Sequence, residues 1–183
     1  VEQIDALAQI ATEFAVFAKM PKADIQSVNI NEVILNVAYL FHDTDNIEIE
    51  TIFPAKDYYV SADRGQLLRV FNNIVKNAIQ AIPENQKGRV EIVVIPGTNQ
   101  HLTISITDNG SGISEEIRDK IFMPNFTTKT SGMGLGMAMT KNIVESFNGK
   151  IWFITGLNIG TTFFVELPLV KNTTEIQHSI EWN

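Results

Sequence analysis

Hydrophobic residues change their spacing several times along the chain, and each spacing predicts a different kind of element. Between Val1 and Met20 they recur every three or four residues, at Ile4, Leu7, Ala11, Phe14 and Ala18, with Ile10 and Phe17 widening the stripe. This pattern predicts an amphipathic helix, which Pro21 ends. We expect residues 1–22 to be one helix of a bundle, separated from its partner. A helix packed on the domain's own sheet is the alternative.

The next residues alternate between polar and apolar, which is typical of short strands. Ile25 to Ile30 predicts a strand, and Asn31 is a candidate N-cap for a helix that runs through Phe41. Residues 46–53 and 58–61 predict two further strands, which we expect to pair antiparallel to each other.

A long helix should then run from Arg64 to about Ile82, because Asp63 can cap its first turn and Pro83 ends it. Its expected apolar face consists of Leu67, Val70, Phe71, Ile74, Ala78 and Ala81. A polar stripe with the same helical period lies beside that face and consists of Gln66, Arg69, Asn73, Asn77 and Gln80.

The second half of the chain predicts two hairpins with helices between them. Residues 89–95 and 101–107 form the first hairpin, and residues 151–155 and 161–167 form the second. Between them we expect a short helix capped by Ser114, a loop over 122–131, and a helix over 134–147 stopped by Asn148 and Gly149. Helices and hairpins mixed in this way predict an α+β two-layer sandwich over residues 23–170. Residues 171–183 read as a polar C-terminal tail.

Composition excludes several classes of protein. The 183 residues are 44% hydrophobic and 19% charged, as in ordinary soluble domains. No apolar run approaches the length of a membrane span, there is no secretory leader, and cysteine is absent, which is compatible with a reducing cytoplasmic location. The net charge of −7 argues against a nucleic-acid partner.

Asn73 and Asn77 lie one turn apart, so both amides point the same way from the edge of the expected core. Such amides need partners, and nearby backbone would suffice. The functional alternative is that the Asn77 carboxamide oxygen coordinates Mg²⁺, which takes such oxygens together with phosphates and water.

Asp108-Asn109-Gly110-Ser111-Gly112 directly follows an apolar strand. It can be a tight turn and nothing more. A carboxylate at the end of that strand can also accept a hydrogen bond from the exocyclic amine of adenine. Gly110 and Gly112 would then let the chain pass close to the base.

Gly132-Met133-Gly134-Leu135-Gly136 opens onto a helix. It follows a loop, and its spacing differs from that of a dinucleotide fingerprint, while the chain has no P-loop motif. Free N–H groups at a helix start favour phosphate, although a flexible hinge is an alternative. Lys129 is a candidate base for the outer phosphates, or a solvated loop lysine.

Together these motifs resemble the ATP-binding domain of sensor histidine kinases. Asn73-x-x-x-Asn77-Ala78 resembles the N box, Asp108-x-Gly-x-Gly112 the G1 box, Ile121 to Lys129 the F box, and Gly132-x-Gly-x-Gly136 the G2 box. Gly160-Thr161-Thr162-Phe163 resembles the last, weaker element of the family. The sequences Phe-Thr-Thr-Lys and Asn-Ala-Ile-Gln-Ala further resemble the nitrogen-regulation branch.

The resemblance implies a Bergerat-type fold with a mixed, mostly antiparallel sheet covered by helices on one face. It implies ATP and Mg²⁺ as cofactors, with Asn73, Lys76 and Lys129 acting in catalysis and Asn77 holding the metal. The implied nucleotide-binding residues are Asn73, Asn77, Asp108, Gly110, Gly112, Ile113, Phe122, Thr128, Lys129, Gly132, Met133, Gly134, Leu135, Gly136 and Thr162.

The resemblance also implies partners. Related hydrolysing ATPases carry Glu where this chain has Asn73, and a carboxamide cannot take a proton from water, so phosphoryl transfer is favoured over hydrolysis. The acceptor would be a histidine on a dimerisation and phosphotransfer hairpin, and residues 1–22 resemble the second helix of that hairpin. The phosphoryl group would pass to a response regulator. The full-length protein would be a homodimer that contacts a membrane only through other parts. His42, His101 and His178 are at unsuitable positions for this acceptor. A pseudo-kinase binding module and a hydrolysing ATPase are the alternatives.

Overall fold

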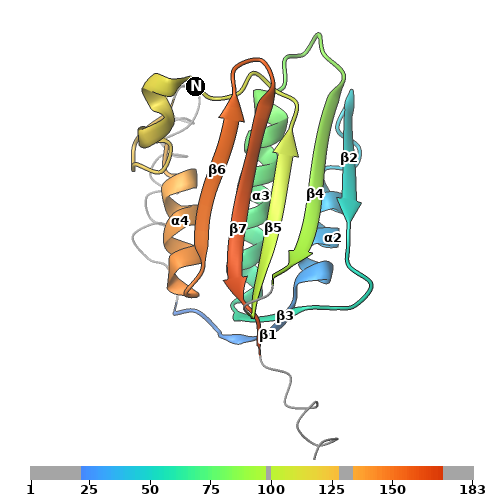
Figure 1. Ribbon diagram of the computed structural model, residues 1–183, viewed down its shortest axis with the longest axis vertical. Helices are drawn as coiled ribbons and strands as arrows, with labels where there is room; N and C mark the ends of the chain where they lie inside the picture. The colour runs from blue at the N-terminus through green and yellow to red at the C-terminus, as the bar shows by residue number, and fades with distance from the viewer. Residues whose placement is uncertain (1–21, 98–99, 128–133, 171–183) are drawn as a thin grey trace, which may run out of the picture.

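The computed structural model of the chain describes residues 22–97, 100–127 and 134–170 (Figure 1). The expected bundle helix, apart from Lys22, and the expected tail over 171–183 lie outside the described residues.

A five-stranded sheet forms one layer of the domain, in the order β2-β4-β5-β7-β6. Its strands are β2 (Ile47–Ile52), β4 (Gly88–Pro96), β5 (His101–Asp108), β6 (Lys150–Gly156) and β7 (Gly160–Pro168). β2 runs parallel to β4, and the other neighbours are antiparallel. Both expected hairpins, β4–β5 and β6–β7, are thereby confirmed.

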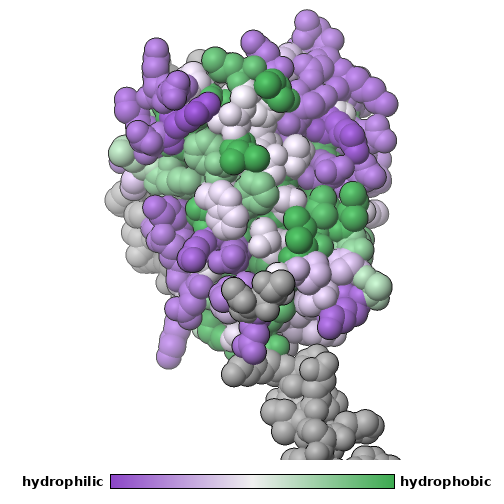
Figure 2. Space-filling model, viewed as in Figure 1, coloured by the Kyte–Doolittle hydropathy of each residue, from purple (hydrophilic) through white to green (hydrophobic). Residues whose placement is uncertain are grey.

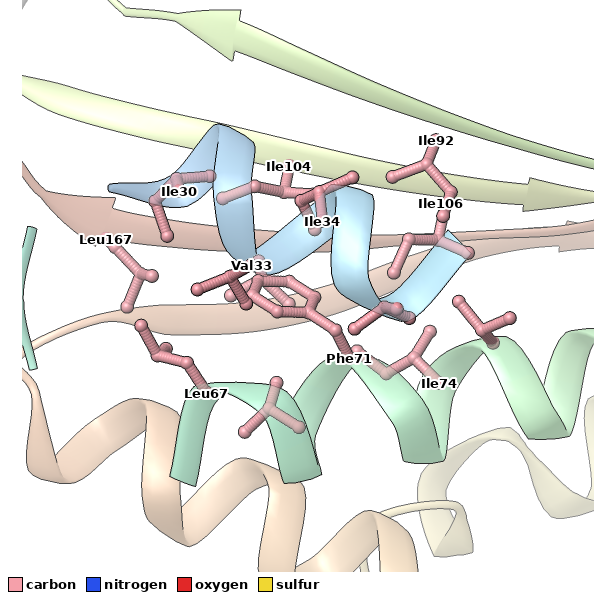
Figure 3. Packing of buried hydrophobic residues seen from close by; sticks show 14 of the residues in the cluster. Ile30, Val33, Ile34, Leu67, Phe71, Ile74, Ile92, Ile104, Ile106 and Leu167 are labelled. Atoms are coloured by element: carbon pink, nitrogen blue, oxygen red, sulfur yellow. The ribbon is translucent and has the colours of Figure 1, made fainter. Parts of the chain in front are cut away.

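In the described part of the chain, three α-helices form the second layer and cover one face of the sheet (Figure 1). They are α2 (Ile30–Leu40), α3 (Arg64–Ala81) and α4 (Gly136–Ser146). The core lies between the layers, where Phe71 of α3 packs among Val33 and Ile34 of α2 and Ile104 and Ile106 of β5 (Figure 3). The predicted α+β two-layer sandwich is confirmed.

The opposite face of the sheet carries no described helix (Figure 1), and it presents both hydrophobic and hydrophilic residues (Figure 2). Alternate residues of each strand point to this face. Trp152 and Phe164 stack there with ring centroids 5.2 Å apart, and Thr107 and Thr162 share a hydroxyl contact of 3.0 Å. Residues on this face therefore point away from the core.

Helix α3 begins and ends where the sequence predicts. Asp63 Oδ1 accepts a hydrogen bond from Gln66 N at 2.9 Å, and the helix stops at Ala81, before Ile82 and Pro83. Its buried face differs from the prediction at two positions, because Val75 is fully buried and Ala81 only half-buried.

The predicted pairing of residues 46–53 with residues 58–61 is wrong. β3 (Tyr59–Ala62) pairs antiparallel with β1 (Gln26–Asn29) in a separate two-stranded sheet, and Leu169 bridges to Val60 of β3. Both sides of β3 are therefore occupied. β2 joins the edge of the large sheet, where its parallel register with β4 lets Ile47 and Ile49 pack against the core.

Three predicted helix starts also need correction. Asn29, and not Asn31, caps α2, with its Oδ1 accepting from Asn31 N at 2.9 Å. Ser114 makes no side-chain capping bond, and the turn after it is a 3-10 helix, η1 (Glu115–Lys120), with no buried residue. α4 begins at Gly136 because Gly134 has a φ of +65°, which a right-handed helix does not accept. Within the described ranges no helix is both long and apolar enough to cross a bilayer.

Candidate functional site

Asn73 of α3 contacts the first two turns of α4. Its Nδ2 donates to Thr140 Oγ1 at 2.9 Å and lies 3.4 Å from Met137 Sδ. A Cβ atom at Gly136 would lie 2.5 Å from Asn73 Oδ1, so any side chain at this position would have to displace the Asn73 amide. The start of α4 is therefore held directly against the Asn73 amide.

The C-terminal end of α3 holds the Asp108–Gly112 turn. Ser111 N donates to Ala81 O at 2.9 Å, and Gly110 lies against the same carbonyl. Asn77 is four residues from both Asn73 and Ala81, about one helical turn in each direction. The half-buried Asn77 thus lies on α3 between the start of α4 and the Asp108 turn.

Asp108 is buried, with 3% of its surface exposed. Its Oδ1 accepts from Gly110 N at 2.9 Å and from Thr161 N at 3.2 Å. Burial raises the pKa of this carboxyl above its ordinary value, and the two backbone hydrogen bonds oppose the rise. One carboxyl oxygen is therefore held by the protein, and no described residue bonds to the other, Oδ2.

The turn itself is anchored on both sides. Asn109 Oδ1 accepts from Arg89 N at 2.8 Å, and its Nδ2 donates to Lys87 O at 3.0 Å. Gly112, with a φ of +72°, packs against the carbonyl of Gly156, where a side chain would collide. Contact with β6 therefore requires glycine at position 112. The sequence had suggested a different reason, the close passage of a nucleotide base.

The remaining described candidates surround these contacts. Ile113 N donates to Thr155 Oγ1 at 2.9 Å, and the Phe122 ring packs 6.0 Å from that of Phe153. Gly134 lies against the backbone of Phe126, which joins the F-box segment to the residues before α4. Leu135 is 4% exposed. Thr128, Lys129, Gly132 and Met133 lie outside the described residues.

Thr162, an expected nucleotide-binding residue, points to the opposite face of the sheet from Asp108. The β5–β7 register pairs Asp108 with Thr161 and Thr107 with Thr162. Strand alternation therefore places the Thr162 hydroxyl on the uncovered face, 3.0 Å from Thr107 Oγ1. Thr161 is the residue paired with Asp108. It shares the core-facing side of β7 with the buried residues Phe163 and Val165, so the alternation within 161–167 was the signal available in the sequence.

Lys76 is exposed on α3 and lines an open groove of about 530 Å³ together with Asn73, Leu40, Phe41 and Leu68. The groove reaches Asn73 but does not include Asp108. His42 stacks on Tyr39 with ring centroids 4.8 Å apart, beyond the end of α2, and His101 opens β5. Neither histidine is among the residues gathered around α3.

Comparison with known proteins identifies the family. The sequence model of the family "Histidine kinase-, DNA gyrase B-, and HSP90-like ATPase" matches residues 62–171, more than half of the chain. The chain belongs to this ATPase family. Sensor histidine kinase ZraS of Escherichia coli is 34% identical over 92% of this chain and 36% of its own length. Adaptive-response sensory kinase SasA of Prochlorococcus marinus is 31% identical over 98% of this chain and 50% of its own.

Solved structures agree with this family. The catalytic domain of histidine kinase ThkA, nucleotide-free, superposes with a TM-score of 0.70 at 36% identity, covering 79% of this chain and 95% of that domain. ThkA in complex with response regulator protein TrrA gives 0.75 at 29% identity, covering 92% of this chain and 49% of ThkA. The chain is thus an ATP-binding catalytic domain of the histidine-kinase type. It spans about a third to a half of the curated relatives it matches.

Proposed function

We propose that this domain binds Mg²⁺-ATP across α3 and the start of α4 and transfers the γ-phosphoryl group to a histidine of its parent protein. The main support is the stripe on α3, where Asn73 meets α4, Ala81 meets the Asp108 turn, and Asn77 lies between them. Three segments distant in sequence are thereby gathered along two turns of one helix.

The adenine end would lie at Asp108. A buried carboxylate with one oxygen held by Gly110 and Thr161 can accept the exocyclic amine of adenine with the other. Ile113 and Phe122, both half-buried, are apolar residues suited to contact a flat base. This arrangement supports adenine recognition by a few fixed polar groups on an apolar surface.

The phosphate end would lie at the start of α4. The free N–H groups of the first turn and the backbone amides of Gly132–Gly136 would bind the triphosphate. Lys76 and Lys129 would supply positive charge to the phosphates. Among the described residues there is no cluster of three His, Cys, Asp or Glu side chains that could cage a metal. Mg²⁺ carried mainly by phosphates and water, with one amide oxygen from Asn77, fits such a site. The ion would neutralise charge on the phosphates.

Asn73 favours transfer over hydrolysis. Its amide donates to Thr140 and has no basic oxygen that could take a proton from water. A neutral imidazole needs no such base, because its nitrogen lone pair forms the P–N bond while the bond from phosphorus to ADP breaks. Positioning and charge neutralisation would then supply most of the rate.

The partners follow from the same proposal. The acceptor histidine would lie on a dimerisation hairpin of the same protein, in cis or in a homodimer partner, on the cytoplasmic side of any membrane. The phosphoryl group would pass to an aspartate of a response regulator, as the ThkA complex with TrrA suggests.

The test is phosphorylation of the chain joined to its native upstream residues, using ATP labelled at the γ-phosphate. Acid-labile, alkali-stable label on the protein is expected, because a P–N bond has this stability. Free phosphate released without labelled protein would instead indicate a hydrolysing ATPase. ATP binding with neither product would indicate a pseudo-kinase module.

A further inference from the structure

One hydroxyl group, that of Thr155, joins the Asp108–Gly112 turn to the β6–β7 hairpin. Thr155 Oγ1 accepts from Ile113 N at 2.9 Å. It also lies 3.1 Å from Gly160 O and 3.0 Å from Thr161 Oγ1. Ile113 directly follows the turn, and Thr161 pairs with Asp108 in the β5–β7 ladder.

The three contacts determine where the hydroxyl hydrogens point. A threonine hydroxyl has one hydrogen and two lone pairs. The Gly160 carbonyl can only accept, so it takes the Thr155 hydrogen. The two lone pairs of Thr155 Oγ1 then receive Ile113 N–H and the Thr161 hydroxyl hydrogen. All three bonds are satisfied together only when Thr161 donates to Thr155.

This assignment has a consequence next to Asp108. Thr161 N donates to Asp108 Oδ1 at 3.2 Å, so fixing Thr161 also fixes the carboxylate. With its hydrogen directed to Thr155, the Thr161 hydroxyl can offer only lone pairs to an approaching base. An ionised Asp108 likewise offers only lone pairs. At position 6 of the purine ring, adenine carries an amine, which can donate to such lone pairs. Hypoxanthine and guanine carry a carbonyl at the same position, which cannot donate.

We propose that Thr155 is a positioning residue that sets the preference of this site for adenine over 6-oxopurines, by fixing Thr161 and the Asp108 turn. The inference rests on the proposed function, in which Asp108 faces the base. It adds a residue outside the motifs that resemble the kinase family, one with no expected contact to the nucleotide.

The experiment uses calorimetry to measure the dissociation constants of Mg²⁺-ATP and Mg²⁺-ITP. Four proteins are compared: the unsubstituted chain, called the parent chain below, and the variants Thr155→Val, Thr155→Ser and Thr162→Val. Valine keeps the β-branched shape of threonine and suits a strand, but it removes the hydroxyl. Thr155→Val should weaken ATP binding about tenfold and narrow the ATP-to-ITP ratio about as much, the size expected for a lost hydrogen bond.

The controls separate this role from general packing. Thr155→Ser keeps the hydroxyl and should keep the parent ratio. Thr162→Val removes a hydroxyl from the same hairpin, also 3.0 Å from another threonine hydroxyl but on the uncovered face, and should change neither constant. Thermal unfolding monitors the fold. Should Thr155→Val fail to fold, Thr161→Val, which keeps the backbone bond to Asp108, is expected to narrow the ratio as well.

A parent-like ratio in a folded Thr155→Val, or in Thr161→Val if the first variant does not fold, overturns the inference while leaving ATP binding established. An equal effect of Thr162→Val overturns it too. A parent chain that binds neither nucleotide overturns the proposed function and this inference together.

Discussion

Asn73 Nδ2 donates to Thr140 Oγ1 at 2.9 Å, and this bond joins α3 to α4 at the point where the expected phosphate site begins. Thr140 is 2% exposed, so the bond is shielded from water. The Asn73 side chain therefore has a structural partner before any nucleotide arrives, and its orientation at the start of α4 is fixed.

Replacing Asn73 by Asp tests whether this fixed amide lies along the triphosphate. The carboxylate has the same shape and can accept from the Thr140 hydroxyl, so the fold should persist. Its negative charge should repel the phosphates and weaken ATP binding about tenfold or more, equivalent to ~1.4 kcal/mol. Calorimetry with ATP and with adenosine measures the effect, and adenosine binding should change little.

Asn142→Asp is the matched control for charge, since it makes the same change on an exposed position of α4. It should leave ATP affinity near that of the parent. Parent-like ATP binding by Asn73→Asp would remove Asn73 from the phosphate site.

Asn77→Ala tests the proposed metal ligand. Loss of the carboxamide should abolish Mg²⁺-dependent ATP binding while the helix remains folded, because alanine is the best helix former. Titration of ATP with and without Mg²⁺ is the measurement. Asn72→Ala is the control on the same helix, since no described residue bonds to its buried Oδ1. Unchanged Mg²⁺-ATP affinity in Asn77→Ala would exclude the assignment.

The parts of the fold that the sequence predicted correctly depend on local signals. Asp63 and Pro83 bound α3, and Asn148, with a φ of +57°, ends α4 as the Asn-Gly pair predicted. The pairing of β2 with β4 was missed because it is parallel and joins strands separated by β3 and all of α3. No turn residue between them specifies such a partner.

The candidate site was predictable to the extent that its motifs are short and contiguous. Asn73, Asn77 and Asp108 are brought together along α3 as expected, but Thr161 and Thr155 were missed. Thr161 lies beside Asp108 because of the register between β5 and β7, two strands that no turn joins, and Thr155 lies opposite Thr161 in the β6–β7 ladder. A register shifted by one residue would place Thr162, and not Thr161, opposite Asp108.

Asp108→Asn should change base preference. The amide can keep the Oδ1 acceptor for Gly110 and Thr161 while replacing the second oxygen with a donor. ATP should bind more weakly and ITP more tightly than in the parent, because the new donor faces the amine of one base and the carbonyl of the other. Competition calorimetry with both nucleotides decides, and an unchanged ratio would place the base elsewhere.

The same variant tests the raised pKa of Asp108, which burial causes. The pKa of Asp108 is near 3.8 in the unfolded chain and higher in the folded chain. Between these two pKa values the folded state binds more protons than the unfolded state. The contribution of Asp108 to the free energy of unfolding therefore falls as the pH rises from the lower pKa to the higher one. Asp108→Asn lacks the contribution. Urea unfolding at a series of pH values measures the effect. The free energy of unfolding of Asp108→Asn minus that of the unsubstituted chain should increase with pH between the two pKa values. A difference that does not change with pH would contradict the raised pKa.

Asp63→Ala should destabilise the domain without touching the site. Asp63 Oδ1 caps α3 through Gln66 N, and Oδ2 accepts from Asp24 N, both at 2.9 Å. Loss of a cap costs about 1 kcal/mol, which urea unfolding at neutral pH can measure.

The hydrogen bond from the Gln66 backbone N–H, followed by that from Asp24, lowers the pKa of the Asp63 carboxyl below 3.8. The electrostatic part of its contribution is therefore present above that pH and is lost as the pH falls through the lowered pKa. Asp63→Asn, which keeps the cap but not the charge, should be nearer to the parent at neutral pH. An alanine variant as stable as the parent would show that α3 does not depend on this cap.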